Sequence, residues 1–159
     1  MVERVLGIDP GLSGAVALLS EGYCGTWTMP IIGAKKKELD LPELLHIIET
    51  ANPDVAIVEK VHAMPKQGVA STFKFGVGYG QIQGMLAALG VPFMLVTPQQ
   101  WKKVVLVGED WKGDKSASVK YCKRLFPHVS LKATARCRKD HDGIADAICM
   151  AVYGQGGEA

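Results

Sequence analysis

Two short apolar runs that each end on an acidic residue constrain the fold of this chain most strongly. Val5 to Ile8 leads into Asp9, and Val55 to Val58 leads into Glu59. A short apolar run bounded by a turn signal such as Pro10-Gly11 is typical of a strand buried on both faces. Such strands occur where helices cover both sides of a sheet. Each run therefore predicts a buried strand that delivers a carboxylate at its carboxyl end.

The remaining segments alternate between strand and helix patterns. Further strands are predicted at 15–19, 23–29 and 92–96, and helices at 40–51, 70–90, 98–101, 114–126 and 142–153, with Asp40, Thr97 and Asp114 as N-caps. This order predicts an α/β fold with a five-stranded mixed sheet flanked by helices. The chain has 159 residues and shows neither a linker nor a repeat, so one domain over residues 1–159 is expected.

Positive charge is concentrated in one part of the chain. Residues 102–139 hold 11 of the 18 Lys and Arg residues but only Glu109, Asp110 and Asp114 among the acids. A segment this basic favours a polyanionic partner, although a solvated lysine-rich surface explains it equally well.

Several classes of protein are not indicated. The longest apolar stretch, Met85 to Val96, is shorter than the roughly 18 residues of a membrane helix, and the chain starts directly on a strand pattern. The four cysteines lack the spacing of a zinc site or a redox pair, which is typical of reduced thiols. We therefore expect a cytoplasmic or nucleoid-associated protein without a membrane partner.

The acidic residues carry the functional information. Asp142 and Asp146 are four residues apart and so share a helical face. If the two acid-ending strands are neighbours, Asp9 and Glu59 meet at the carboxyl edge of the sheet. Four such carboxylates raise one another's pKa and favour a hard divalent cation, and two Mg²⁺ ions suit displacement at a phosphodiester. Each acid alone is equally compatible with a turn, surface or helix-start role.

Three motifs resemble RuvC-type Holliday junction resolvases: Gly7 to Ala15 (GIDPGLSGA), Val58 to Val61 (VEKV) and Asp142 to Ala147 (DGIADA). The resemblance spans nearly the whole chain in the same order. Segments 71–80 and 98–102 look more like the chloroplast and phage members than like the bacterial housekeeping enzyme.

This resemblance implies an RNase H-like fold and a homodimer that cuts two opposed strands of four-way junction DNA. It implies Asp9, Glu59, Asp142 and Asp146 as ligands of two Mg²⁺ ions, with Mn²⁺ as the expected substitute. The contact between protomers is implied to be the 70–90 helix, where Gly80 and Gly84 would permit close approach. Packing of the same helix on the sheet must account for part of its apolar side chains.

The chain departs from the bacterial members around its last acids. Those members place the final two site residues three apart, whereas position 143 is Gly here. Helical geometry favours Asp142 over Asp140 as the fourth ligand. His141 is a candidate for protonating the leaving 3′ oxygen or positioning the water, with a solvated helix-entry residue as the alternative.

Basic side chains near these motifs are expected to contact DNA phosphates. They are Lys35, Lys36, Lys37, Lys60, Lys66, Lys74, Lys102, Lys103, Lys112, Lys115, Arg136, Arg138 and Lys139. His62 stands where the family carries an aromatic that stacks on a junction base, although a solvated loop histidine is the plainer interpretation. Trp101 is expected to be a core residue.

The sequence thus predicts a Mg²⁺-dependent endodeoxyribonuclease that resolves four-way junctions by paired cleavage. The same motifs allow three alternative functions. An actin-like or sugar-kinase-like ATPase opens with the same Gly-Ile-Asp-x-Gly pattern but needs a duplicated domain. A non-catalytic junction-binding module would keep the fold, although the intact acids argue against it. An RNA-processing nuclease of the same fold stays open.

Overall fold

The computed structural model describes residues 4–157 and contains a five-stranded sheet in the order β3-β2-β1-β6-β7. The strands are β1 (Val5–Asp9), β2 (Ala15–Ser20), β3 (Tyr23–Thr28), β6 (Val55–Glu59) and β7 (Phe93–Val96). The first three form an antiparallel meander, whereas β6 runs parallel to β1, and β7 runs parallel to β6. The predicted mixed sheet is confirmed, and the two acid-ending strands are neighbours.

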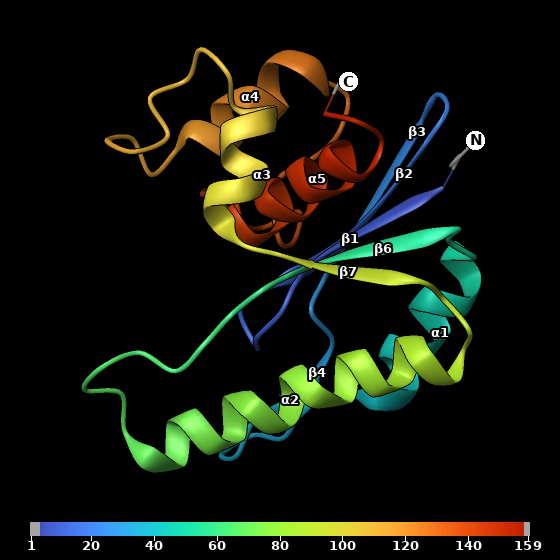
Figure 1. Cartoon of the computed structure of the whole chain (residues 1–159), viewed down its shortest axis with the longest axis vertical. Coiled ribbons are helices and arrows are strands. Elements are labelled where there is room, and N and C mark those ends of the chain that lie inside the picture. Colours follow the sequence, from blue (N-terminus) through green and yellow to red (C-terminus); the bar gives the residue numbers. More distant parts are fainter. Residues whose placement is uncertain (1–3, 158–159) are drawn as a thin grey trace.

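Helices cover both faces of this sheet (Figure 1). On one face lie α3 (Pro98–Val105), α4 (Ala117–Leu125) and α5 (Asp142–Gly154), and on the other lie α1 (Leu41–Ala51) and α2 (Val69–Ala88). Alternate residues of β1 belong to two different cores, because successive side chains of a strand point to opposite faces. Val5 packs in the core around α5, whereas Leu6 and Ile8 pack in the core with α1 and α2.

Helix α5 lies directly on β1, and Gly7 makes this approach possible. A Cβ at position 7 would lie 1.9 Å from the carbonyl oxygen of Ala147 and 2.8 Å from the amide nitrogen of Ala151. Only glycine fits where two backbones are this close. The contact fixes the position of α5 along β1, and with it the position of Asp146 relative to the end of the strand.

Two predicted N-caps are confirmed and one is wrong. Asp40 accepts from the amide of Glu43, and Thr97 forms a capping box with Gln100 at the start of α3. Asp114 does not cap α4, which begins at Ala117; its carboxylate instead accepts from the amide and hydroxyl of Ser116. A short acidic side chain bonding two residues ahead competes with helix formation at that point.

Other boundaries differ modestly from the prediction. Helix α3 continues to Val105 rather than ending at Trp101, and α2 covers 69–88 in spite of its glycines. The segment expected as a loop at 30–39 contains a two-stranded arm, β4 (Ile31–Ile32) and β5 (Glu38–Leu39). Within the part of the chain that the structure describes, no helix has the length and apolar character needed to cross a bilayer.

Candidate functional site

Three carboxylates meet at the carboxyl edge of the sheet. Asp9 ends β1 and Glu59 ends β6, and the residues just before them, Ile8 and Val58, are paired in the parallel ladder. Asp146 comes from α5, immediately before the turn that contacts Gly7. All three acids are half-buried. The structure therefore brings these predicted site residues together from two strands and one helix.

The cluster carries more negative charge than its surroundings compensate. Burial raises the pKa of Asp9 to about 8, and the charges of Glu59 and Asp146 add to this effect. Burial is also the main reason why the pKa values of Glu59 and Asp146 are raised. Lys102 acts in the opposite direction, since its ammonium lowers the pKa of all three carboxylates. A bound cation would relieve the remaining repulsion.

Two side chains from the surrounding helices hold these acids. The indole Nε1 of Trp101 on α3 donates to Oε2 of Glu59 at 3.0 Å. The hydroxyl of Ser118, a buried polar residue on α4, hydrogen-bonds to Asp146 and lowers the pKa of its carboxyl group. Each of the two acids thus has a neutral hydrogen-bond donor on a different helix.

The start of α5 brings His141 and Gly143 to the same place. His141 is the N-cap residue, and its Nδ1 accepts from the amide of Ile144 at 3.1 Å. A Cβ at position 143 would lie 2.9 Å from Cε1 of His141 and 3.1 Å from Oδ2 of Asp9. The imidazole and the Asp9 carboxylate therefore flank Gly143, whose missing side chain leaves room for both.

The two remaining acids of this segment have different surroundings. Asp142 is the exposed first residue of α5, and its charge raises the pKa of Asp146. Asp140 is held by Lys123 at 2.7 Å and Lys132 at 3.0 Å, and these bonds lower the pKa of its carboxyl group. Asp142 thus adds to the charge of the cluster at its margin, whereas Asp140 is neutralised by its own ion pairs.

The donor set fits a hard divalent cation in its chemistry, because it consists of carboxylate oxygens with excess negative charge. Within residues 4–157, no three His, Cys, Asp or Glu side chains are grouped so that they could hold an ion in their described positions.

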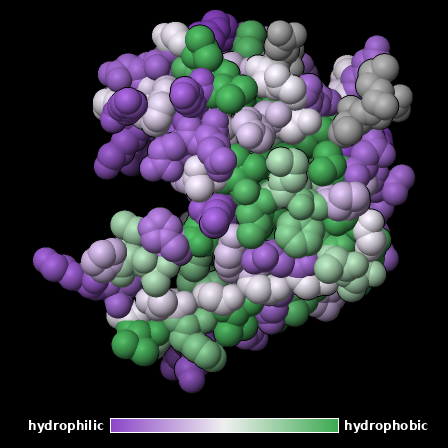
Figure 2. Space-filling view, viewed as in Figure 1, coloured by the Kyte–Doolittle hydropathy of each residue, from purple (hydrophilic) through white to green (hydrophobic). Residues whose placement is uncertain are grey.

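A groove of about 1280 Å³ opens beside Asp9, between the β4–β5 arm and α2. Its walls carry Phe75, the apolar part of α2, and three lysines, Lys36, Lys37 and Lys74. Figure 2, in the same view as Figure 1, shows a deep notch between α2 and the helices on the other face of the sheet. Hydrophilic side chains dominate the upper rim of this notch.

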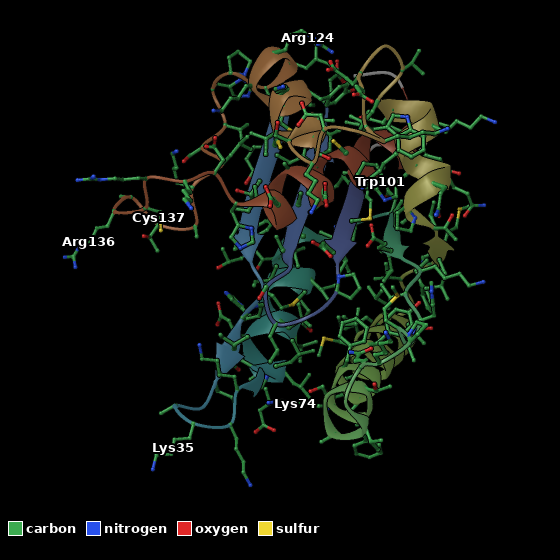
Figure 3. All side chains as sticks on the ribbon, turned by 90° about the vertical axis from the view of Figure 1, so that its left-hand side faces the viewer. Lys35, Lys74, Trp101, Arg124, Arg136 and Cys137 are labelled. Atoms are coloured by element: carbon green, nitrogen blue, oxygen red, sulfur yellow. The ribbon has the colours of Figure 1, made fainter. Side chains whose placement is uncertain are left out.

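The other predicted DNA-contacting residues lie around the site in separate segments. Lys35 lies on the β4–β5 arm and Arg136 on the 126–141 loop, and both extend away from the body of the molecule (Figure 3). Exposed positions are also found for Lys60, His62, Lys66, Lys103, Lys112, Lys115, Arg138 and Lys139. Of the predicted DNA-contacting residues, Lys102 alone is half-buried and interacts with the acids.

Helix α2 leaves an apolar stripe uncovered. Ile82 and Leu86 face the core, whereas the opposite side presents Val69 and Phe73, which are 88% and 73% exposed, followed by Val77. A Cβ added at Gly80 or Gly84, further along this side, would meet no atom within 4 Å. This side of the helix is therefore not covered by the sheet or by any other described part of the chain.

Sequence reasoning missed the two donors of this site. Trp101 was expected in the core, and it is fully buried there, but its bond to Glu59 was not expected. The sequence did contain a signal for this bond. Thr97 starts α3 directly after β7, the strand that pairs with β6, so the first turn of α3 lies near the end of β6, where Glu59 is. Ser118 had no comparable signal, since the predicted cap of α4, Asp114, lies two residues before the observed N-cap, Ser116.

No protein-family model matches the sequence. Similar folds occur in three solved structures. RuvC of Thermus thermophilus has a TM-score of 0.59 and 22% identity over 98% of both chains. The same protein bound to a Holliday junction has a TM-score of 0.57 and 17% identity over 97% of both chains. The yeast mitochondrial Holliday junction resolvase has a TM-score of 0.57 and 16% identity over 94% of this chain and 76% of its own.

These likenesses cover the whole sheet and its flanking helices at low sequence identity. The chain therefore has the RNase H-like fold that is found in RuvC and in the yeast mitochondrial resolvase.

Proposed function

We propose that this protein is a metal-dependent endonuclease that resolves four-way DNA junctions. The observation that carries this proposal is the meeting of Asp9, Glu59 and Asp146 at the carboxyl edge of a RuvC-like sheet. Two of the similar structures are described as Holliday junction resolvases or as bound to a junction, which supports the same substrate here. The intact acidic cluster favours a nuclease over a junction-binding module without activity.

The three carboxylates, with Asp142 as a fourth, would hold two Mg²⁺ ions, and Mn²⁺ is expected to substitute. When bound, such ions activate the attacking water and stabilise the leaving oxygen of a phosphodiester. Lys102 would lie close to the scissile phosphate, because its positive charge already acts on all three carboxylates. The other basic residues would hold the DNA arms through phosphate contacts.

His141 is suited to donating a hydrogen bond near Asp9. Its Nδ1 accepts a backbone hydrogen bond, so the neutral ring carries its proton on Nε2. This N–H would hydrogen-bond to the leaving 3′ oxygen or to the attacking water, while the same residue caps α5. The capping role is the structural alternative, and an asparagine at this position would keep the cap without the imidazole N–H.

We further infer that the active form is a homodimer joined through the uncovered side of α2. A four-way junction has two equivalent strands to cut, so a two-fold dimer would place one site at each. The uncovered stripe supports this assignment, since it begins with Val69 and Phe73 and continues with glycines that permit close helix approach. Affinity to the phage and chloroplast members is part of this proposal, and so is a cytoplasmic or nucleoid-associated location.

The direct test is cleavage of an immobile four-way junction with Mg²⁺ and with EDTA. Duplex DNA, a flap and a structured RNA serve as controls, and the RNA tests the processing-nuclease alternative. We expect paired cleavage of the junction that depends on Mg²⁺. Asp9→Asn should abolish cleavage and leave junction binding within about threefold of wild type, because it removes a ligand and no phosphate contact. An Asp9→Asn protein that cleaves at the wild-type rate would overturn the proposal.

A further inference from the structure

The hydrogen bond between Trp101 and Glu59 has features that core packing alone does not require. Trp101 is completely buried among the side chains that fill the face of the sheet under α5. Its indole N–H is the only polar group of this side chain, and it is aimed at the carboxylate that ends β6. Apolar side chains of similar volume would fill the same space without placing a donor there.

The backbone around this bond holds the donor and the acceptor in a fixed relation. Glu59 is paired with Val96 of β7, and the amide of Lys60 donates to the carbonyl oxygen of Val96 at 2.7 Å. Thr97 follows at once and opens α3 with its capping box, so Trp101 lies one turn into the helix. The paired strands and the capped helix therefore set where the indole N–H lies.

We propose that Trp101 is a positioning residue for Glu59: its indole N–H holds Oε2 and thereby orients the carboxylate for the cation that the site binds. This inference rests on the metal-dependent function proposed above. Among the described residues Trp101 is the hydrogen-bond donor to Glu59, so Oε1 has no protein donor. A half-buried carboxylate fixed at one oxygen loses less conformational freedom when it binds a cation.

The Trp101 ring also contacts Lys102, whose positive charge acts on the carboxylates. The ammonium of Lys102 lies 5.2 Å from the centroid of the Trp101 ring. A phenylalanine would keep a ring for this contact and would fill most of the volume, but it has no N–H. The substitution Trp101→Phe therefore removes the hydrogen bond while keeping the aromatic packing.

Trp111 provides a matched control within the same chain. It packs against the same core, and the ammonium of Lys112 lies 5.5 Å from its ring centroid. Its indole makes no hydrogen bond to a carboxylate within the described residues. Trp111→Phe is therefore the same chemical change at a less buried position of the same core, without Glu59.

The first experiment measures Mg²⁺ binding by calorimetry in the absence of DNA. We expect Trp101→Phe to raise the Mg²⁺ dissociation constant about 10-fold to 100-fold, as for other groups that orient metal ligands. Trp111→Phe should leave it within about twofold of wild type. Equal affinities for wild type and Trp101→Phe would overturn the inference, and so would equal losses in the two variants.

The second experiment uses the wild-type protein, so it does not depend on the folding of a variant. In ¹⁵N-labelled protein, the indole N–H resonance of Trp101 is followed during a titration with Mg²⁺. We expect it to move with the binding curve, while the resonances of Trp27 and Trp111 stay in place. Triple-resonance and NOE spectra of the wild-type protein assign the three signals. A Trp101 resonance that stays unchanged at Mg²⁺ saturation would overturn the inference.

The two proposals fail in different ways. If the wild-type protein binds Mg²⁺ and cleaves junctions but Trp101 fails both tests, the proposed function stands and the positioning role is wrong. If Trp101 passes both tests but no junction is cleaved, the positioning role stands and the substrate is wrong. If the wild type binds no Mg²⁺, both proposals are overturned.

Discussion

At the scale of single residues, ion pairing separates the acids that stabilise this fold from those that form its site. Asp140 is neutralised by Lys123 and Lys132, whereas Asp9 and Asp146 lie among like charges. Half-buried carboxylates that lie together without a basic partner repel one another and lower the stability of the fold. Such clusters are typical of sites that bind a cation, because the cation removes the repulsion. The surroundings of each acid therefore predict different outcomes when it is replaced by its amide.

We expect Asp142→Asn to reduce junction cleavage at least tenfold and Asp140→Asn to reduce it by less than about threefold. Asp142 shares a helical face with Asp146, while Asp140 is occupied by two lysines. Single-turnover cleavage with saturating Mg²⁺ measures this directly. A larger loss for Asp140→Asn would show that the fourth ligand has been assigned to the wrong acid.

The metal-free protein should lose stability as the pH rises, and Asp9 should account for much of this loss. Its carboxyl pKa is 3.8 when the chain is unfolded and about 8 when it is folded. Between these pH values the folded state holds more protons than the unfolded state, so the free energy of unfolding falls as the pH rises.

Asp9→Asn should therefore have a free energy of unfolding about 1–3 kcal/mol higher than wild type in EDTA at pH 8, and should melt several degrees higher. Near pH 4 the melting temperatures of the two proteins should be equal. Calorimetry from pH 4 to pH 8 measures the difference. Glu49→Gln, an exposed acid on α1, is the control and should follow wild type. A constant offset between Asp9→Asn and wild type at every pH would contradict the prediction.

At the scale of elements, two glycines allow α5 to lie in close contact with β1 and with the Asp9 side chain at its end. Gly7 permits backbone contact with the middle of the helix, and Gly143 leaves room for Asp9 and His141 at its start. The glycine three residues before Asp146, a departure from the bacterial pattern, is therefore explained by the space that the Asp9 carboxylate occupies.

Gly143→Ala should lower cleavage at least tenfold without unfolding the protein. Alanine raises helix propensity by about 1 kcal/mol, which offsets part of the strain, but its Cβ would displace Asp9 or His141. Gly80→Ala on α2 makes the same chemical change where the added Cβ would meet no atom within 4 Å. Its melting temperature is the control for stability alone, because Gly80 belongs to the proposed dimer contact. Normal cleavage by Gly143→Ala would show that this contact does not position the site.

Helix α2 combines an inner side in the core with an outer side that is uncovered. Gly84→Arg should therefore fold normally, because a Cβ added here would meet no atom within 4 Å and the arginine can extend into solvent. It should prevent a second helix from approaching and give a monomer that nicks junctions slowly but loses paired cleavage. Sedimentation velocity at micromolar concentration and a nicking assay measure both effects.

Thr50→Arg, on the exposed side of α1, adds the same charge elsewhere and should remain dimeric. A dimeric Gly84→Arg protein, or a wild-type monomer that junction DNA leaves unchanged, would contradict the dimer.

At the scale of the whole molecule, the sequence predicted what is encoded locally and missed what depends on distant pairing. The apolar runs before Asp9 and Glu59 gave both strands, because strand burial and the terminal acid lie within five consecutive residues. The bond from Trp101 to Glu59 joins residues 42 apart, and it depends on the β6–β7 register and on the length of α3. The arm at β4 and β5 was missed because two-residue strands show no periodicity.

The distribution of charge over the whole molecule leads to the last prediction. The acids lie at the carboxyl edge of the sheet, while Arg136, on the 126–141 loop, extends away from the body of the molecule (Figure 3), and Arg138 is an exposed residue of the same loop. We expect these two side chains to bind backbone phosphates of a DNA arm and to take no part in the reaction. Each lost phosphate contact reduces the steepness with which affinity falls as salt is added.

The double variant Arg136→Gln/Arg138→Gln should therefore bind the junction more weakly at low salt, and its log–log salt dependence should be shallower by about two units. Fluorescence anisotropy in EDTA between about 50 and 200 mM salt measures the slope. Lys120→Gln removes a lysine of the same basic segment whose ammonium is paired with Asp114, so its slope should match wild type. Cleavage by the double variant at saturating enzyme should stay near the wild-type rate, since the acids are untouched. An unchanged salt slope would mean that the DNA arm binds elsewhere on the molecule. A large decrease in the cleavage rate would mean that these arginines belong to the active site itself.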